Sequence, residues 1–223
     1  MATSAPAPAD AALVVELDPL LLGGFALSDE VLTERLKKYG VVDDDPFRFA
    51  RRIYGQPFAE ALGALVPKGV DQAHVERRLT ATYTALLQQH AQQSRAAIRA
   101  MLRPLAKAGI RLAAITHLRA DIVSELCEGI PGEVLPILDP TPVSVGLSHA
   151  MLQSAIVALG MPVRQCFALT ACGVSVRAAL RVGLRAAIIP DPMVTFENCA
   201  GADFIADKPD RAFWTRLKAR LGA

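Results

Sequence analysis

The chain has 223 residues, of which 52% are apolar, so it is long enough to bury a sizeable core in one domain or in one domain with an insertion. Its 24 basic and 22 acidic residues nearly cancel, which argues against proteins that bind nucleic acid or an anionic membrane. No run of about 18 or more apolar residues occurs, and the opening MATSAPAPAD lacks the basic and apolar regions of a signal peptide. We expect a cytoplasmic globular protein with a disordered tail at residues 1–10.

Four cysteines stand at positions 127, 166, 172 and 199. Their spacing matches neither the CxxC pairs of a zinc site nor a small disulfide framework. Because free cysteines are among the most buried residue types, we expect reduced, buried thiols in a cytosolic protein.

The first predicted element is a buried strand over residues 12–18, in the apolar run AALVVELDP. It ends on Glu16 and Asp18, two carboxylates separated by one residue. This resembles a buried strand whose end places acidic side chains in a cleft.

Residues 28–93 carry helical periodicity without strand patterns. Ser28 is expected to cap the first helix and Asp71 the last. The predicted helices lie in SDEVLTERLKKYG, DPFRFARRIYG, PFAEALGALV and DQAHVERRLTATYTALLQQHAQQ.

From about residue 94, helices alternate with short apolar strands in RLAAIT, EVLPILD, QCFALT, RAAIIPD and ADFIAD. The helices lie in SRAAIRAMLRPLAKAG, RADIVSELCEGI, SHAMLQSAIVALG and VSVRAALRVG. This alternation predicts right-handed βαβ units and a parallel sheet covered on both faces. The expected fold class is α/β, with a three-layer Rossmann-like core at 11–23 and 95–223 and an inserted α-helical cap domain at 24–94.

Several of these segments together carry a resemblance: the acid-bearing first strand, the helical insertion, KAGIRLAAITHLRADIVSEL, and ALGMPVRQCFALTACGVSVRAALRVGLRAAIIPD. They resemble the haloacid dehalogenase (HAD) superfamily, and within it the phosphoglycolate phosphatase and β-phosphoglucomutase branch with a helical cap. The resemblance covers nearly the whole chain after residue 10, and RAALRVGLRAAIIP is its most specific part. It implies a HAD-like fold and a phosphatase site that holds Mg²⁺.

The first family motif places a nucleophilic Asp at the end of strand one and a general acid and base two residues later. The match puts Glu16 at the nucleophile and keeps Asp18. Glu16 carries an extra methylene that moves its carboxylate by about 1 Å, and such a displacement can cost on the order of a hundredfold in rate. Pro19 stands where the family usually has Gly, and it withdraws a backbone N–H from the phosphate. Both departures weaken a phosphoryl site.

The second motif, a Thr or Ser that ends a strand, is matched by Thr116. Its hydroxyl can bind a phosphate oxygen, and an equally good alternative is that it caps the following helix. His117 beside it can face the cleft, although the sequence offers no partner at a useful spacing, so a packed or solvated histidine is the preferred interpretation.

The third motif supplies a lysine, and this chain has none between Lys107 and Lys208. The expected position falls near Gly146, or near Thr141 if the following proline is the anchor. The candidate substitutes are Arg119 and His149, although an arginine needs a different geometry from a lysine.

The fourth motif normally presents two aspartates that hold Mg²⁺. They fall on Ala171 and Ser175, within Thr170, Ala171, Cys172, Gly173, Val174 and Ser175. Without these acids, Mg²⁺ loses its carboxylate ligands, and phosphoryl transfer loses its main electrostatic stabilisation. Cys172 precedes a helix N-terminus that can lower a thiol pKa, but an inert buried thiol is the preferred interpretation.

These departures favour a pseudoenzyme. The first hypothesis is a non-catalytic HAD-like protein that binds a partner protein or a small phosphorylated ligand, with Thr116, His117, Thr170, Cys172 and the helix N-terminus after Gly173 as the binding site. No cofactor or metal is then expected, and a homodimer is compatible with the sequence. The alternative is a phosphoric monoester hydrolase that uses Glu16 or Asp18 with Mg²⁺ held by other residues.

Overall fold

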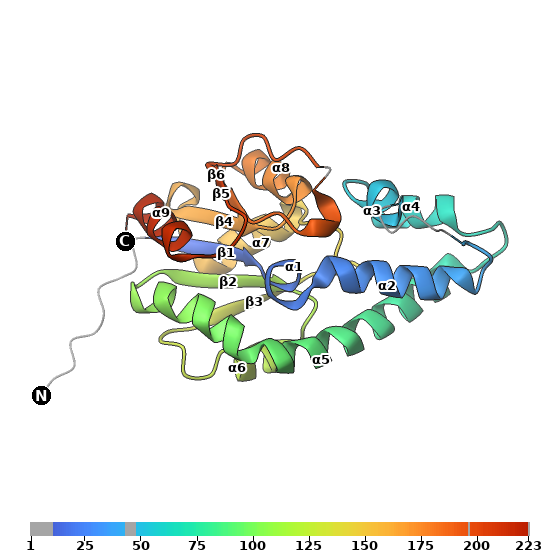
Figure 1. Cartoon of the computed structure of the whole chain (residues 1–223), viewed down its shortest axis with the longest axis horizontal. Coiled ribbons are helices and arrows are strands. Elements are labelled where there is room, and N and C mark those ends of the chain that lie inside the picture. The colour runs from blue at the N-terminus through green and yellow to red at the C-terminus, as the bar shows by residue number, and fades with distance from the viewer. Residues whose placement is uncertain (1–10, 43–47, 196, 223) are drawn as a thin grey trace, which may run out of the picture.

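The computed structural model describes residues 11–42, 48–195 and 197–222, so the expected tail at 1–10 lies outside the described residues. Six parallel strands form one sheet in the order β3-β2-β1-β4-β5-β6 (Figure 1). The strands are β1 (Ala12–Glu16), β2 (Arg111–Thr116), β3 (Val134–Leu138), β4 (Cys166–Thr170), β5 (Arg185–Ile188) and β6 (Phe204–Ile205). The predicted parallel α/β sheet is confirmed.

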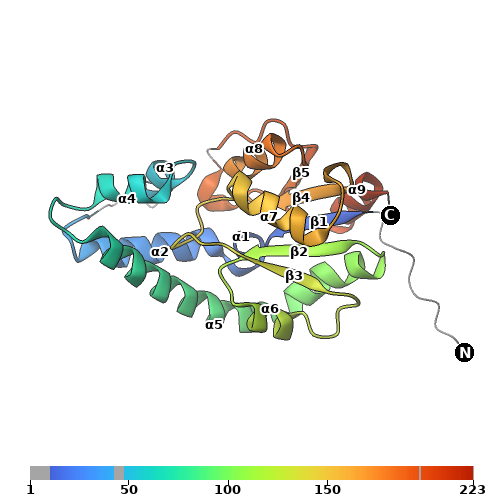
Figure 2. The same cartoon turned by 180° about the vertical axis from the view of Figure 1, so that it is seen from behind.

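Helices cover both faces of this sheet. On one face lie α5 (Gln72–Lys107), α6 (Ala120–Leu126) and α9 (Arg211–Leu221), and on the other lie α7 (His149–Leu159) and α8 (Gly173–Arg181) (Figures 1 and 2). Side chains alternate along β1, so Leu13 and Val15 enter one apolar cluster while Ala12 and Val14 enter the other. The three-layer arrangement follows from this alternation. Helix α9 has no counterpart among the elements expected from the sequence.

The first strand is shorter than predicted. It ends at Glu16, and Asp18 lies in the short helix α1 (Leu17–Leu22) instead of the strand. A Cβ at Gly24 would stand 2.9 Å from the Asp18 carbonyl carbon, so the turn from α1 into α2 (Gly24–Lys37) needs a glycine there. Ser28 is not the cap of α2, because it lies within the helix and donates to the Gly24 carbonyl at 2.7 Å.

Helix α5 is continuous over 36 residues, whereas the sequence predicted two helices. Its N-cap is Asp71 as expected, with the Asp71 carboxylate accepting from the His74 N–H at 3.1 Å. One buried stripe runs along it through Leu79, Tyr83, Leu87, Ala91, Ile98 and Leu102. The expected boundary at residues 94 and 95 therefore falls inside one continuous helix, and the division into cap and core domains stays a prediction.

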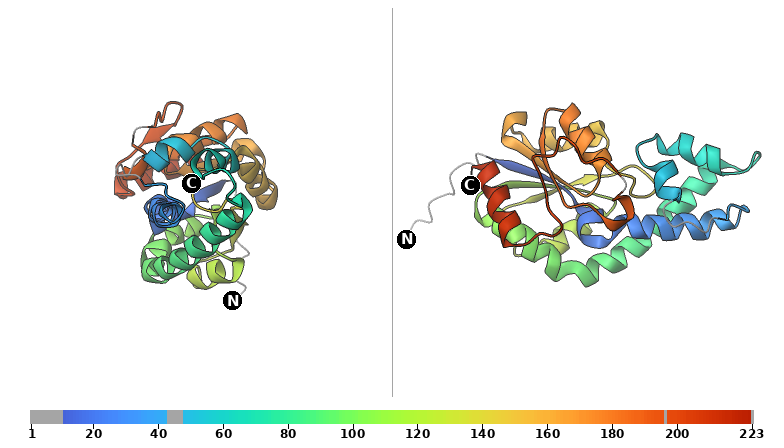
Figure 3. Two further views of the ribbon diagram at one scale, coloured as in Figure 1. Left: turned by 90° about the vertical axis from the view of Figure 1, so that its right-hand side faces the viewer. Right: turned by 45° about the horizontal axis from the view of Figure 1, so that its top comes forward.

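The helical region consists of α2, α3 (Arg48–Ile53), α4 (Phe58–Leu65) and the first part of α5 (Figure 3). No strand occurs in the described residues between 28 and 93. This region touches the sheet-covering helices, since a Cβ at Gly55 would lie 3.3 Å from the Val174 side chain at the start of α8. Tyr54 packs on Phe25 with ring centroids 5.0 Å apart, so apolar contacts continue from this region over the end of β1.

Two short 3-10 helices, η1 (Val163–Gln165) and η2 (Pro192–Val194), complete the described elements. All four cysteines are free, with positions 166 and 172 buried and positions 127 and 199 only partly buried, so full burial was wrong for two of them. Within the described ranges, no helix combines the length and the apolar character needed to cross a lipid bilayer.

Candidate active site

The carboxyl ends of three neighbouring strands bring the expected site residues together. Glu16 ends β1, Thr116 ends β2 and Thr170 ends β4, and β1 pairs with both other strands. Parallel strands end at the same edge of a sheet, where open α/β sheets place their ligand sites. Each of the three side chains is at most 2% exposed. The Thr170 hydroxyl donates to the Ala187 carbonyl at 3.4 Å.

The Glu16 carboxyl group is held by two donors from the chain itself. Its Oε2 accepts from the Ala171 N–H and its Oε1 accepts from the Ser175 hydroxyl, each at 2.8 Å. Burial raises the pKa of Glu16 to about 8, since the two hydrogen bonds lower it less and the charges of Asp139 and Asp18 raise it further. Glu16 is therefore largely protonated at neutral pH.

Ser175, at the second expected metal position, is fully buried and binds three neighbours. Its hydroxyl accepts from the Leu147 N–H at 2.8 Å and lies 3.1 Å from the Cys172 Sγ. Cys172 is the N-cap of α8, with its sulfur accepting from the Ser175 N–H at 3.5 Å. Burial raises the pKa of this thiol well above its usual value, and the charges of Glu16 and Glu197 raise it further. The helix N-terminus thus does not produce a reactive thiolate.

The N-terminus of α8, proposed from the sequence as an anion site, already receives a carboxylate of this chain. The Val174 N–H donates to the Glu197 Oε2 at 2.8 Å. A Cβ at Gly173 would stand 2.4 Å from the Asn198 carbonyl oxygen, so only glycine allows this close approach. Glu197 therefore stands where the sequence placed a ligand's anionic group.

Replacing Gly173 with Ala should destabilise the protein by about 1–3 kcal/mol, because the new methyl group meets backbone atoms that cannot rotate away. At the exposed position 63 within α4, a new Cβ would stand 3.1 Å from the Gln72 Oε1, a side-chain end that can move aside, so the same substitution should change stability by less than about 1 kcal/mol. Urea denaturation of the Gly173→Ala and Gly63→Ala variants tests this difference in size. Equal effects at the two positions would contradict the close approach of residue 198 to α8.

Asp18 accepts three hydrogen bonds from the end of β2. Its Oδ1 accepts from the Thr116 hydroxyl, and its Oδ2 accepts from the His117 N–H at 2.9 Å and lies 2.7 Å from the His117 Nδ1. Thr116 does not cap the next helix, whose N-cap is Arg119, and instead its oxygen accepts from the Leu118 N–H at 3.1 Å. Both Asp18 oxygens are thus used within the protein.

His117 lies between two carboxylates, a partnership that the sequence interpretation missed. Its Nε2 is 3.2 Å from the Thr141 hydroxyl and 3.7 Å from the Asp139 Oδ2. Burial lowers the pKa of His117, but the hydrogen bond to Asp18 and the charges of Asp139 and Asp18 outweigh it, so the pKa is raised overall. Asp139 follows directly after β3, which pairs with β2. The pairing of these two strands is the signal that could have predicted its position beside His117.

Tyr83 of α5 packs against His117 of the site and was also absent from the sequence prediction. Its hydroxyl lies 2.7 Å from the Ser144 hydroxyl, and its ring meets the His117 ring edge-on at a centroid distance of 4.9 Å. Both side chains are buried. The helical region therefore contributes directly to the walls of the site.

The position expected for the lysine holds Gly146 in one register of the third motif and Thr141 in the other. Gly146 lies beside α8, where a Cβ would stand 3.0 Å from the Cys172 sulfur, whereas Thr141 bonds to Asp139 at 2.6 Å. The two candidate substitutes do not reach the site. Arg119 pairs with Asp121 with a 70% exposed side chain, and the residue at 149 is exposed on α7.

These residues do not fit a Mg²⁺ ion. Such an ion needs carboxylate oxygens, whereas positions 171 and 175 offer a methyl group and a hydroxyl, and the oxygens of Glu16 and Asp18 accept from protein donors. Among residues 11–42, 48–195 and 197–222, no group of three or more His, Cys, Asp or Glu is arranged to hold a metal.

Comparison with solved structures identifies the fold. CbbY from Rhodobacter sphaeroides, solved with phosphate, matches with a TM-score of 0.65 and 22% identity over 88% of this chain and 93% of that one. A hydrolase from Pseudomonas syringae matches with a TM-score of 0.67 and 16% identity over 94% and 98%. A protein assigned as a β-phosphoglucomutase from Thermotoga maritima matches with a TM-score of 0.59 and 16% identity over 93% of this chain and 99% of that one. No family model and no curated protein matches the sequence.

Proposed function

We propose that this chain, which has the HAD-like fold of those solved structures, is a non-catalytic protein that binds a partner protein or a small phosphorylated ligand. One observation carries the proposal. The Glu16 carboxyl group is bound by the Ala171 N–H and the Ser175 hydroxyl, at the two positions where the family resemblance places metal-binding aspartates. At these two positions the chain therefore presents hydrogen-bond donors to Glu16 instead of carboxylate ligands for a metal.

This arrangement removes the main sources of catalysis together. A largely protonated Glu16 is a poor nucleophile, and the expected motif positions carry neither a lysine nor metal-binding aspartates to stabilise the charge on a transferring phosphoryl group. The side-chain oxygens and nitrogens of Glu16, Asp18, Thr116 and His117 all have hydrogen-bond partners. These buried polar groups therefore contribute to a stable fold without a bound substrate.

A second candidate function is supported by the contacts of Asp18. The Asp18 and His117 side chains are 2.7 Å apart, and Asp139 lies on the other side of the imidazole. An aspartate paired with a histidine is a competent acid and base. On this alternative the chain is a phosphoric monoester hydrolase in which Asp18 or Glu16 acts, with Mg²⁺ held by residues not yet located. Cytoplasmic location, dimer formation and the absence of nucleic-acid or membrane partners stay predictions.

The purified protein should hydrolyse p-nitrophenyl phosphate and common sugar phosphates with Mg²⁺ no faster than a Glu16→Ala, Asp18→Ala double variant. The reason is the joint loss of the metal acids and the lysine. Release of phosphate, followed for both proteins and for His117→Ala, is the measurement. A turnover on the order of 1 s⁻¹ that disappears in the double variant would refute the proposal. Its loss in His117→Ala would support the second candidate.

A further inference from the structure

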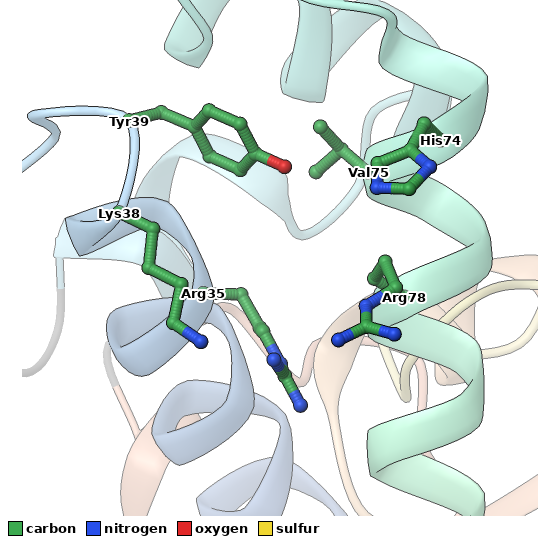
Figure 4. A pocket seen from close by; sticks show the side chains of 6 residues that line it. All are labelled: Arg35, Lys38, Tyr39, His74, Val75 and Arg78. Carbon is green, nitrogen blue, oxygen red and sulfur yellow. The ribbon is translucent and has the colours of Figure 1, made fainter.

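A pocket lined by cationic side chains lies between α2 and α5, at the end of α2 that points away from the sheet (Figures 1 and 4). Its volume is about 220 Å³. The lining side chains are those of Arg35, Lys38, Tyr39, His74, Val75 and Arg78. None of them belongs to the Glu16 site.

The cationic groups of this pocket share no carboxylate partner. Figure 4 shows Arg35, Lys38 and Arg78 directing their nitrogens into the space between the two helices. No carboxylate of the described residues lies within ion-pair distance of any of the three. Like charges gathered at one place repel each other, so a bound anion would lower the energy of this arrangement.

Arg35 is held in position before any ligand arrives. Its Nε and Nη2 donate to the Thr82 Oγ1 at 3.1 and 2.5 Å, and the Thr82 hydroxyl donates to the Arg78 carbonyl at 2.9 Å. The half-buried guanidinium therefore keeps its plane fixed while its remaining N–H groups stay available. A fixed guanidinium suits the oxygens of a phosphoryl group, because less conformational freedom is lost on binding.

Size and local charge narrow the ligand class. At about 220 Å³ the pocket is smaller than the roughly 300–1,000 Å³ typical of sites for drug-sized molecules. Among the acids on these helices, Glu34 is exposed, Glu76 accepts from Gln72 at 3.1 Å, and Asp71 caps α5 and lies 3.9 Å from Arg77, so none of them forms an ion pair with the three cations. We propose that this pocket binds a small anion carrying one or two phosphoryl groups. The inference holds whether or not the Glu16 site is catalytic.

Calorimetric titration of the full chain with inorganic phosphate, pyrophosphate and ribose 5-phosphate tests the site. We expect binding of at least one anion, and a Lys38→Gln, Arg78→Gln double variant should weaken it about tenfold or more through the loss of two charge-assisted contacts. The matched control is Lys37→Gln, Arg77→Gln, which removes the same charge from the same helices outside the pocket. Arg77 is 68% exposed and lies 3.9 Å from Asp71. The control should bind within about twofold of the wild type.

Two results would overturn the inference: no binding of any of the three anions, or equal weakening in both double variants. Stronger binding of pyrophosphate would indicate an inorganic ligand, and stronger binding of ribose 5-phosphate a sugar phosphate. If the protein binds an anion at this pocket and also hydrolyses phosphate esters, the pocket inference stands and the proposed non-catalytic function is refuted.

Discussion

Replacing Glu16 with Gln should stabilise the protein by about 3 kcal/mol at pH 7 and by about 5 kcal/mol at pH 9, with little effect below pH 4.5. The pKa of Glu16 is raised from 4.5 to about 8 on folding. Between these values the folded state binds the proton more tightly than the unfolded state, so the wild type loses stability as pH rises through this range and no further above it. A glutamine has no proton to lose and escapes this penalty.

Glutamine can also keep the contacts of Glu16. Its amide oxygen can accept from the Ala171 N–H, and its NH₂ group can donate to the Ser175 oxygen, which then donates to the Cys172 sulfur. Urea denaturation at several pH values is the measurement, and the control is Glu133→Gln at an exposed loop position. A Glu16→Gln effect that stays constant from pH 5 to pH 9 would mean that Glu16 is ionised in the folded protein, and would favour the metal-dependent alternative.

Restoring the three family carboxylates with Glu16→Asp, Ala171→Asp and Ser175→Asp should create Mg²⁺ binding that the wild type lacks. The three positions converge, since Glu16 contacts both others at 2.8 Å. Three buried carboxyl groups should repel and destabilise the metal-free variant. Mg²⁺ at a hundred times its dissociation constant should then recover about 2.7 kcal/mol. Melting temperatures with and without millimolar Mg²⁺ report the effect.

The control for this variant replaces the same three residues with Asn, which has a similar shape and no charge. It should lose stability without recovering it in Mg²⁺, because amides are weaker ligands than carboxylates. A wild type that gains several degrees with Mg²⁺, while the triple Asp variant gains no more, would show a native metal site. The phosphatase alternative would then take precedence over the pseudoenzyme proposal.

The local pattern of apolar residues was sufficient to predict most strands of the sheet. Short apolar runs and capped helices have their own periodicity, so the segments RLAAIT and QCFALT predicted β2 and β4 correctly. The break predicted near residue 94 was wrong because the polar stretch QQHAQQ contains neither Gly nor Pro. Buried Leu87, Ala91 and Ile98 continue one stripe through it, so packing keeps α5 intact.

The identities of the residues at the family positions were determined by the sequence alone. Glu16, Ala171 and Ser175, together with the missing lysine, are facts of composition and register that need no coordinates. Tertiary structure decided what these residues do instead. Glu16 and Ser175 are separated by 159 positions in the chain, and the partnership of His117 with Asp139 depends on the pairing of β2 with β3. Such contacts arise from the packing of distant segments, which local periodicity cannot specify, and burial in that packing raises the pKa of Glu16.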